Sequence, residues 1–378
     1  MFWWDWDTEK TSGTRQTRDN NMWGLGGSLV YKTGFYEGVG ATVGFYGSVP
    51  LHDDNIVSGN TTNFGKAGKD TYHTRVDGTE GAMGNFAQAF LEYKTGKTNV
   101  KVGRQLIDSK MLASNDTKMI PNSFEALVIE NKNLPDTTLR AGYIMSQKLR
   151  DHQTFHSVIA YNTDTNKVYG NNDSGVHKGL STKNIRQKGE DADPEMVLIT
   201  VANKSIPNLK LNAEYIGLSG FFNTVVAEAN YQIKLNDSWT FTHGIRYLKQ
   251  MDDGAGAIGG ASLSGKAASL TNTNPGTSGG RAVYSNPDSV DGSIIMARAV
   301  AANGPLELQA GYAKIADDAD IIAPWRGFPT GGYVRSMGQV DWIANTKNWA
   351  VKATYDFGKE CLTPSLNSVL QRSMLIRR

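Results

Sequence analysis

The chain has 378 residues, with 39 Lys and Arg against 37 Asp and Glu, and a single cysteine, Cys361. The formal net charge of +2 provides no broad basic surface, so we expect no binding to nucleic acid. One thiol excludes an internal disulfide and any metal site built from several cysteines. No run approaches the roughly 18 to 20 apolar residues that a membrane-spanning helix needs, which leaves spanning by β-strands open.

Patterns in which apolar and polar residues alternate recur along most of the chain. Because successive side chains of a strand point to opposite faces, each pattern predicts a strand with one apolar face and one polar or small face. The clearest pattern covers residues 225–235, where Val226 is the one apolar residue on the polar face. In chain order, such patterns include residues 39–46, 139–146, 209–215, 225–235, 239–247, 306–312 and 349–357.

We expect about 14 to 16 strands, joined alternately by short links such as residues 95–98 and by long polar loops, as in outer-membrane β-barrels. Tyr and Trp recur near the ends of the apolar faces, where the bilayer meets water in such a barrel. A soluble or surface-anchored β-sandwich that binds ligands or adheres also alternates and is kept as the alternative. Long loops are predicted at residues 50–84, 106–123, 150–194, 249–292 and 316–332.

Two stretches match enzyme motifs by their letters. Residues 254–259 spell the dinucleotide-binding fingerprint, but the strand, the helix and the acidic residue that should frame it are not expected there. Residues 276–280 spell the nucleophile elbow around Ser278, yet no helix is expected to follow it. We therefore expect no enzyme activity, no catalytic residue and no cofactor, and we interpret both stretches as parts of one loop.

Clusters of histidine and aspartate raise the question of a metal site. His152 and His156 have the spacing of two ligands on one helix face, but the glutamate of the metalloprotease motif is missing. The cluster of Asp317, Asp318 and Asp320 lacks the glycine that turns a calcium-binding loop. We interpret both clusters as ordinary loop residues and expect no bound metal.

The loop at residues 106–123 reads LIDSKMLASNDTKMIPNS and combines charges with apolar residues such as Met111, Leu112, Met119 and Ile120. A loop exposed to water would not need such anchors, so we expect it to fold inward against the wall and narrow the lumen. An external loop that packs on its neighbours is the alternative. Charged and polar side chains at a constriction select ions, and the candidates are Asp108, Lys110, Asn115, Asp116 and Lys118.

Two blocks of sequence resemble the substrate-specific outer-membrane porins of the OprD type. The first block is KVGRQL at residues 101–106, followed by NDTKMIPNSFE at residues 115–125. The second is IAPWRGFPTGGY at residues 322–333. The resemblance spans most of residues 20–360, and it implies a barrel of about 18 antiparallel strands, often assembled as a trimer, with its third loop folded into the lumen.

The same resemblance implies a ladder of Arg and Lys that guides carboxylate-bearing solutes along the lumen. Strand parity selects as ladder candidates Lys101, Arg140, Lys210, Arg246, Arg335 and Lys352. Arg104 is a further candidate, but it shares parity with Val100 and Val102 and would reach the lumen only if a bulge intervenes. Glu228, on the polar face of residues 225–235, is the candidate for an opposing acidic group on the wall.

We interpret residues 1–378 as one β-barrel domain that is porin-like over residues 20–360 and atypical at residues 1–19 and 361–378. The first residues lack a signal-peptide pattern and the last end in LIRR without a terminal aromatic residue, so both ends are expected to be incomplete. The expected function is that of an outer-membrane porin, a passive diffusion channel for small hydrophilic solutes that are charged or carry a carboxylate. Its expected partners are outer-membrane lipid and further copies of the chain in a homotrimer.

Overall fold

The computed structural model describes residues 2–6, 20–53, 82–114, 119–150, 152, 154–160, 177–267, 284, 286–322, 329–334, 342–356 and 368–374. One antiparallel sheet dominates it, and the order of the 15 strands in the sheet is their order in the chain. The strands are β1 (Phe2–Trp6), β2 (Asn20–Lys32), β3 (Val39–Asp53), β4 (Met83–Thr95), β5 (Thr98–Gln105), β6 (Ser123–Asn131), β7 (Thr137–Lys148), β8 (Met196–Asn203), β9 (Leu209–Leu218), β10 (Phe222–Lys234), β11 (Trp239–Asp252), β12 (Gly292–Asn303), β13 (Leu306–Ile315), β14 (Lys347–Tyr355) and β15 (Ser368–Met374).

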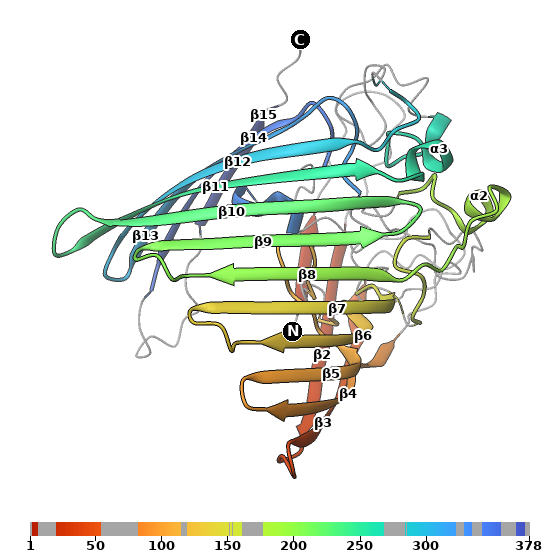
Figure 1. The fold of residues 1–378 in the computed structure, drawn as a ribbon, viewed down its shortest axis with the longest axis horizontal. Coiled ribbons are helices and arrows are strands. Elements are labelled where there is room, and N and C mark those ends of the chain that lie inside the picture. Colours follow the sequence, from red (N-terminus) through yellow and green to blue (C-terminus); the bar gives the residue numbers. More distant parts are fainter. Residues whose placement is uncertain are drawn as a thin grey trace.

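This topology confirms the predicted all-β fold, and the described residues form 15 strands, where the patterns predict about 14 to 16. Short and long connections alternate along most of the sheet, as expected: residues 96–97 link β4 to β5, whereas residues 106–122 link β5 to β6. The alternation is interrupted between β9 and β10, where a long connection is expected and residues 219–221 form a short one. Figure 1 shows α2 and α3, which belong to two long connections, at the right-hand end of the sheet, the loop end, and the short turn between β10 and β11 at the left-hand end, the turn end. The described residues contain no ladder between β1 and β15.

Helices are short and confined to the long connections. α2 (Thr182–Gln187) lies between β7 and β8, α3 (Ala255–Gly259) between β11 and β12, and the 3-10 segment η1 (Pro329–Val334) between β13 and β14. The Ser181 hydroxyl caps α2 by accepting from the Asn184 backbone N–H at 3.1 Å. In the part of the chain that the structure describes, no helix is long and apolar enough to cross a membrane.

Two strand ends and the surroundings of one motif differ from the predictions. β3 continues to Asp53 and β11 to Asp252, although the pattern predicts loops from residues 50 and 249, because backbone pairing does not require alternating polarity. Residues 254–259 follow β11 directly and include the one-turn helix α3, so a strand and a helix do frame the apparent dinucleotide fingerprint. The fingerprint needs a parallel β-α-β unit, however, and β11 and β12 are antiparallel.

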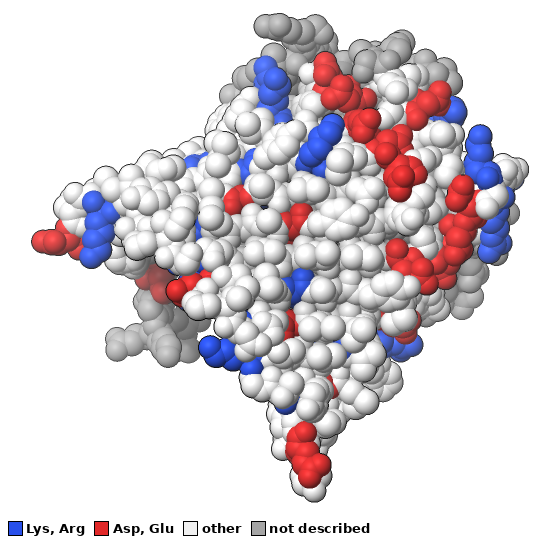
Figure 2. Space-filling model, in the orientation of Figure 1, with Lys and Arg blue, Asp and Glu red and all other residues white. Residues whose placement is uncertain are grey.

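Alternate residues of each strand lie on opposite faces of the sheet, as predicted. On β10, Val225 and Ile233 are 40% and 39% exposed, whereas Thr224 and Glu228 at the alternate positions are 1% and 6% exposed. We call the face that carries Val225 the outer face and the face that carries Glu228 the lumen face. Figure 2 shows mostly uncharged side chains on the wall, with Asp and Glu gathered toward the loop end. This polarity is typical of strands that cross a bilayer.

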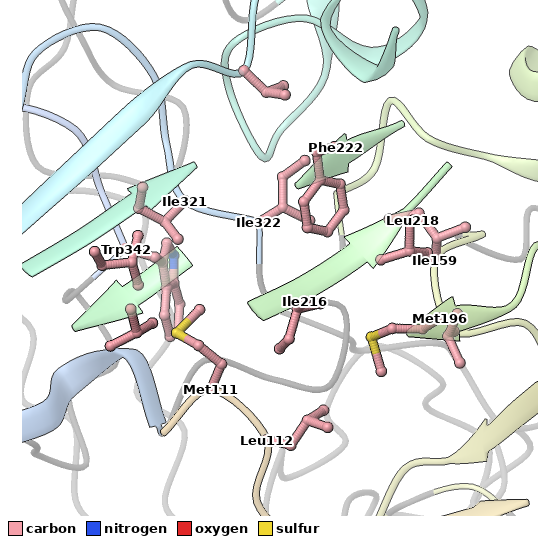
Figure 3. Close-up of a cluster of buried hydrophobic side chains, with 14 of the residues drawn as sticks. Met111, Leu112, Ile159, Met196, Ile216, Leu218, Phe222, Ile321, Ile322 and Trp342 are labelled. Carbon is pink, nitrogen blue, oxygen red and sulfur yellow. The ribbon is translucent and has the colours of Figure 1, made fainter. Parts of the chain in front are cut away.

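The hydrophobic core lies on the lumen face at the loop end. Met111 and Leu112 from the β5–β6 connection and Trp342 from the β13–β14 connection belong to one buried cluster with Ile216 and Phe222 of the wall. Figure 3 shows these side chains converging from the wall and from the connections. Burying such a side chain contributes roughly 1.5–3 kcal/mol, which explains why connections rich in apolar residues fold inward. The inward fold predicted for residues 106–123 is therefore confirmed for the described part of this loop.

A buried histidine joins two connections at the loop end. The Nε2–H of His177 donates to the Gly260 carbonyl at 2.7 Å, and its Nδ1 accepts from the Gly179 backbone N–H at 3.1 Å. The side chain is fully buried, and burial lowers the pKa of His177 to about 4 because the imidazolium would lose its hydration. The imidazole is therefore neutral in the folded protein at neutral pH.

We expect acid to destabilise the fold through His177 between about pH 6.5, its pKa in an unfolded chain, and about pH 4. In this window the unfolded chain binds a proton that the folded chain excludes, so the free energy of unfolding falls with the pH, by at most about 3 kcal/mol. Thermal unfolding of the wild-type protein and of His177→Gln over this window checks the effect. The variant cannot titrate and should lose less stability; an identical pH dependence would contradict this role of His177.

Ala227, near the middle of β10, lies on the outer face, and Gln232 lies on the lumen face of the same strand. We expect Ala227→Lys to lower the free energy of unfolding in a bilayer by about 2–4 kcal/mol, because the charge would lie in hydrocarbon. The control Gln232→Lys should cost far less, since that side chain faces the lumen. Urea unfolding in lipid vesicles measures both variants, and equal losses would contradict the assignment of the faces.

Candidate functional site

The β5–β6 connection begins with a compact turn that its own polar side chains stabilise. The Ser114 hydroxyl accepts from the Ile107 backbone N–H at 2.9 Å, and the Asp108 carboxylate accepts from the Ser114 backbone N–H at 2.9 Å. Ser and Asp favour such turns because their side chains satisfy nearby backbone donors. The turn brings two predicted constriction residues, Asp108 and Lys110, close to the wall.

Glu214 on the lumen face of β9 binds this turn. Its carboxylate accepts from the Ser109 hydroxyl at 2.8 Å and from the backbone N–H groups of Lys110 and Met111 at 2.8 and 3.0 Å. Glu214 is 3% exposed, and a buried carboxylate is stable only where such donors replace water. The hydrogen bonds therefore fasten the turn to the wall.

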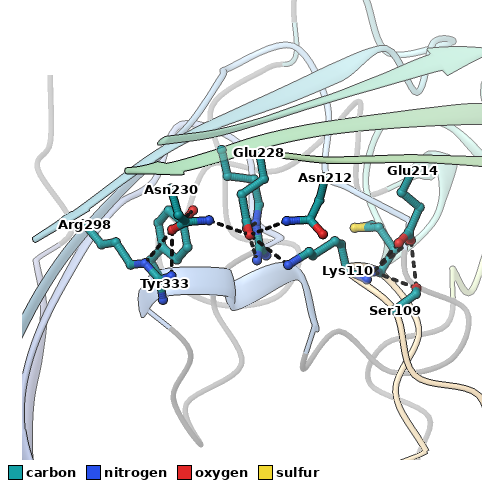
Figure 4. Close-up of polar contacts among 10 residues, drawn as sticks. Ser109, Lys110, Asn212, Glu214, Glu228, Asn230, Arg298 and Tyr333 are labelled. Atoms are coloured by element: carbon teal, nitrogen blue, oxygen red, sulfur yellow. Dashed lines mark hydrogen bonds and ion pairs between the residues drawn. The ribbon is translucent and has the colours of Figure 1, made fainter. Parts of the chain in front are cut away.

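Glu228 on the neighbouring strand β10 is the centre of the charged site in Figure 4. Its carboxylate accepts from Lys110 Nζ at 2.8 Å, from Asn230 Nδ2 at 2.9 Å, and from Arg246 Nε and Nη2 at 2.6 and 2.5 Å. Lys110 comes from the connection, whereas Arg246 comes from β11 and lies directly opposite Glu228 in the ladder. One carboxylate thus binds a loop cation and a wall cation at the same time.

Arg298 of β12 and Tyr333 of η1 extend this site. Arg298 donates to Asn230 Oδ1 from Nε at 3.0 Å and from Nη2 at 2.6 Å, and the Tyr333 hydroxyl donates to the same oxygen at 3.3 Å. The Arg298 guanidinium also lies 4.5 Å from the centroid of the Tyr333 ring. A Cβ added at Gly244 would lie 2.9 Å from the Tyr333 hydroxyl, so this approach requires glycine. We call six residues the eyelet: Lys110, Glu228, Asn230, Arg246, Arg298 and Tyr333.

A cavity of about 440 Å³ adjoins the eyelet and extends toward the turn end. Its lining includes four basic side chains, Lys110, Lys204, Lys210 and Arg298, and two acidic ones, Glu228 and Glu307. The remaining lining is largely amide and aliphatic. Low-dielectric walls focus the field of such charges into the space they enclose, so the cavity can concentrate and orient a charged solute.

Five of the predicted ladder residues occupy lumen-face positions. Arg140 donates from Nη2 to the Asp108 carbonyl oxygen at 2.7 Å, which connects β7 to the same turn. Lys101 Nζ lies 4.0 Å from Glu92 Oε1 and 5.1 Å from the centroid of the Phe90 ring. These positions are spread over five strands, and one of them, Arg246, belongs to the eyelet. The five are Lys101, Arg140, Lys210, Arg246 and Lys352.

Arg104 lies on the outer face, contrary to its place in the predicted ladder. It pairs with Ala89 on one side and Glu125 on the other, and its Nε donates to Glu125 at 2.9 Å. Val102, two residues earlier, is 47% exposed on the same face, and the pairings of β5 run without a register shift. The bulge that would turn Arg104 inward is therefore absent from β5. The predictions outside the described residues are Asn115, Asp116, Lys118 and Arg335.

Sequence reasoning missed four residues of the site: Glu214, Asn230, Arg298 and Tyr333. Glu214 and Asn230 stand on predicted polar faces, but alternation does not show which polar residues a folded-in connection will touch. Arg298 belongs to β12, whose two faces are both largely apolar because the lumen face packs in the core. It is the one charged residue in that strand, and a lone arginine in an apolar run was the available signal.

An antiparallel wall with an apolar outer face, an inward-folded connection and a charged lumen defines an outer membrane porin. The model of the outer membrane porins of the OprD family matches residues 1–367, and the chain belongs to this family. No curated protein sequence matches the chain. The match confirms the predicted family and the outer membrane as its location, and it does not support the β-sandwich alternative.

Solved structures of related porins share the fold at low sequence identity. A BenF-like porin from Pseudomonas fluorescens Pf-5 has a TM-score of 0.66 at 14% identity, over 94% of this chain and 75% of that chain. OccK8 (OprE) of Pseudomonas aeruginosa has a TM-score of 0.63 at 16% identity, over 92% and 76%. OccK1 (OpdK) of the same organism has a TM-score of 0.62 at 16% identity, over 89% and 72%.

We expect Glu228→Gln to raise the ratio of anion to cation permeability roughly twofold, because Lys110 and Arg246 lose their shared counter-charge. Reversal potentials in planar bilayers under a KCl gradient measure this ratio. The control Glu125→Gln removes the same charge from the outer face, and it should leave selectivity unchanged. Equal shifts in the two variants would contradict the placement of Glu228 at the eyelet.

Proposed function

We propose that this porin is a passive channel for small hydrophilic solutes that carry a carboxylate group. The eyelet and the adjoining cavity contain five basic side chains against the two acidic ones, Glu228 and Glu307. An excess of positive charge in a confined aqueous space lowers the energy barrier for anions and raises it for cations. The basic side chains are Lys110, Lys204, Lys210, Arg246 and Arg298.

The environment of Arg298 is the observation that carries this proposal. Lys110 and Arg246 both pair with Glu228, which offsets their charge. Within the described residues Arg298 meets no carboxylate and donates to the neutral amide oxygen of Asn230. A planar guanidinium can donate two parallel hydrogen bonds to a carboxylate, so Arg298 is suited to bind one as it passes.

One of the similar structures is that of OpdK from Pseudomonas aeruginosa with vanillate, itself a carboxylate, which supports this class of solute. The solute would move down its own gradient with no bond made or broken, so the proposed role is not enzymatic and needs no cofactor. Exposed apolar side chains on the outer face, such as Val225 and Ile245, support outer-membrane lipid as the surrounding partner. The homotrimer that the family resemblance implies is part of the same proposal.

We expect Arg298→Gln to lower the ratio of anion to cation permeability roughly twofold and to slow the entry of lactate. Reversal potentials under a KCl gradient measure the first effect. Uptake into proteoliposomes of lactate and of lactamide, its neutral amide of similar size, measures the second. Lactamide uptake should not change, because it carries no charge for Arg298 to attract.

Arg104→Gln is the matched control, since it removes the same charge from the outer face of the wall. It should leave selectivity and lactate uptake at the wild-type level. Unchanged lactate uptake in Arg298→Gln would contradict the proposed class of solute, and so would an equal loss of lactamide uptake, which would indicate a narrowed pore.

A further inference from the structure

Gly26 lies on the lumen face of β2. Its cross-strand partner is Ser48 of β3, which is 2% exposed, whereas the preceding Leu25 is 49% exposed on the outer face. The following Gly27 shares the outer face with Leu25, because strand side chains alternate. Two adjacent glycines thus occupy opposite faces of one strand.

Met119, near the end of the inward-folded connection, occupies the space in front of Gly26. A Cβ added at Gly26 would lie 2.5 Å from Met119 Sδ, 2.8 Å from its Cβ and 3.0 Å from its Cγ. Bending the flexible end of the methionine would not relieve this clash, because its Cβ moves only with the backbone. At Gly27 an added Cβ would have no atom within 4 Å. The contact is therefore specific to the glycine on the lumen face.

The backbone at Met119 supports a fixed position for this residue. Its φ angle is 72°, in the left-handed region that side chains other than glycine rarely adopt and that persists only where packing enforces it. Ile120 is fully buried next to it. Asn122 then accepts from the Arg150 backbone N–H at 2.6 Å and donates to the Ala113 carbonyl at 3.4 Å. The bond to Ala113 joins the two described parts of the connection.

The same connection is bound to the far side of the wall by Glu214 and Glu228 on β9 and β10. Six strands lie between β2 and β9 in the sheet. We propose that the β5–β6 connection acts as a strut, a segment attached to the wall at two places: to Glu214 and Glu228, and to β2 at Gly26. Gly26 is the positioning residue that lets the Met119 end lie against β2, and we call the contact between Gly26 and Met119 the seat. The absence of a side chain at residue 26 then sets how far the strut lies from this wall, and so the width of the lumen beside it. This inference requires a porin and is independent of the solute that the porin prefers.

Cross-linking tests the seat directly. In a Cys361→Ser background, Gly26→Cys combined with Met119→Cys leaves the two Cβ atoms 2.8 Å apart at the observed positions, so a shift of about 1 Å brings them to the roughly 3.5–4.5 Å of a disulfide. Gly27→Cys combined with Met119→Cys places the two thiols on opposite sides of the wall. We expect mild oxidation in proteoliposomes to cross-link the first pair at least about tenfold faster than the second. Equal rates would overturn the proposal. This readout needs a folded protein but no channel current, so it stands apart from the test of the solute.

Conductance tests whether the seat sets the width of the lumen. We expect Gly26→Ala to change the unit conductance in KCl by about 1.5-fold or more, and Gly27→Ala to leave it unchanged. Adding Met119→Gly to Gly26→Ala removes all three contacting atoms and suits the left-handed backbone, so it should return conductance toward the wild-type value. Wild-type conductance in Gly26→Ala, or no recovery in the double variant, would overturn the proposal.

If Gly26→Ala does not insert into the bilayer, its conductance cannot be measured, and insertion itself becomes the test. If Gly26→Ala alone fails to insert, insertion of the double variant supports the contact, because removing the Met119 atoms has then repaired the defect. Failure of both variants, with Gly27→Ala inserting normally, would overturn it.

Discussion

Two carboxylates on adjacent strands determine the interior of this porin. Glu214 accepts from the backbone of the β5–β6 turn, and Glu228 accepts from Lys110 of that turn together with Arg246 of the wall. Both acids are buried on the lumen face, and a buried carboxylate is costly unless donors surround it. If the connection left the wall, both acids would lose donors that it supplies. Its inward position is therefore the stable one, and the eyelet depends on it.

The wall uses the same pair of residue types on both of its faces. Arg246 and Glu228 pair across β11 and β10 on the lumen face, and Arg104 and Glu125 pair across β5 and β6 on the outer face. In each case the partners are directly opposite in the ladder, so the local chemistry is nearly the same. The two pairs differ in the face of the sheet on which they lie. Because side chains alternate along a strand, an odd or even position in the strand decides whether a charge faces the lumen.

Local patterns were sufficient for some parts of the site and insufficient for others. The apolar residues Met111 and Leu112 predicted an inward fold, since their burial is favourable wherever a core is within reach. They could not show that Ser109 would meet Glu214, 105 residues later in the chain. Arg104 was misplaced because the family resemblance suggested a basic ladder, whereas its parity with Val102 pointed outward. Parity was the better guide there, because side-chain direction in an unbulged strand follows directly from position.

By itself the sequence determined the strands and their apolar outer face, because alternation and turn composition act between residues a few positions apart. The resemblance of residues 101–125 and 322–333 to OprD-type porins indicated the class of protein. Tertiary structure alone decided the eyelet. Lys110 and Arg246 meet at Glu228, and Arg298 and Tyr333 meet at Asn230, because strand register and the inward fold bring distant segments together. Met119 reaches Gly26 for the same reason. No pattern of neighbouring residues predicts these contacts, since they depend on how the sheet and its connections pack.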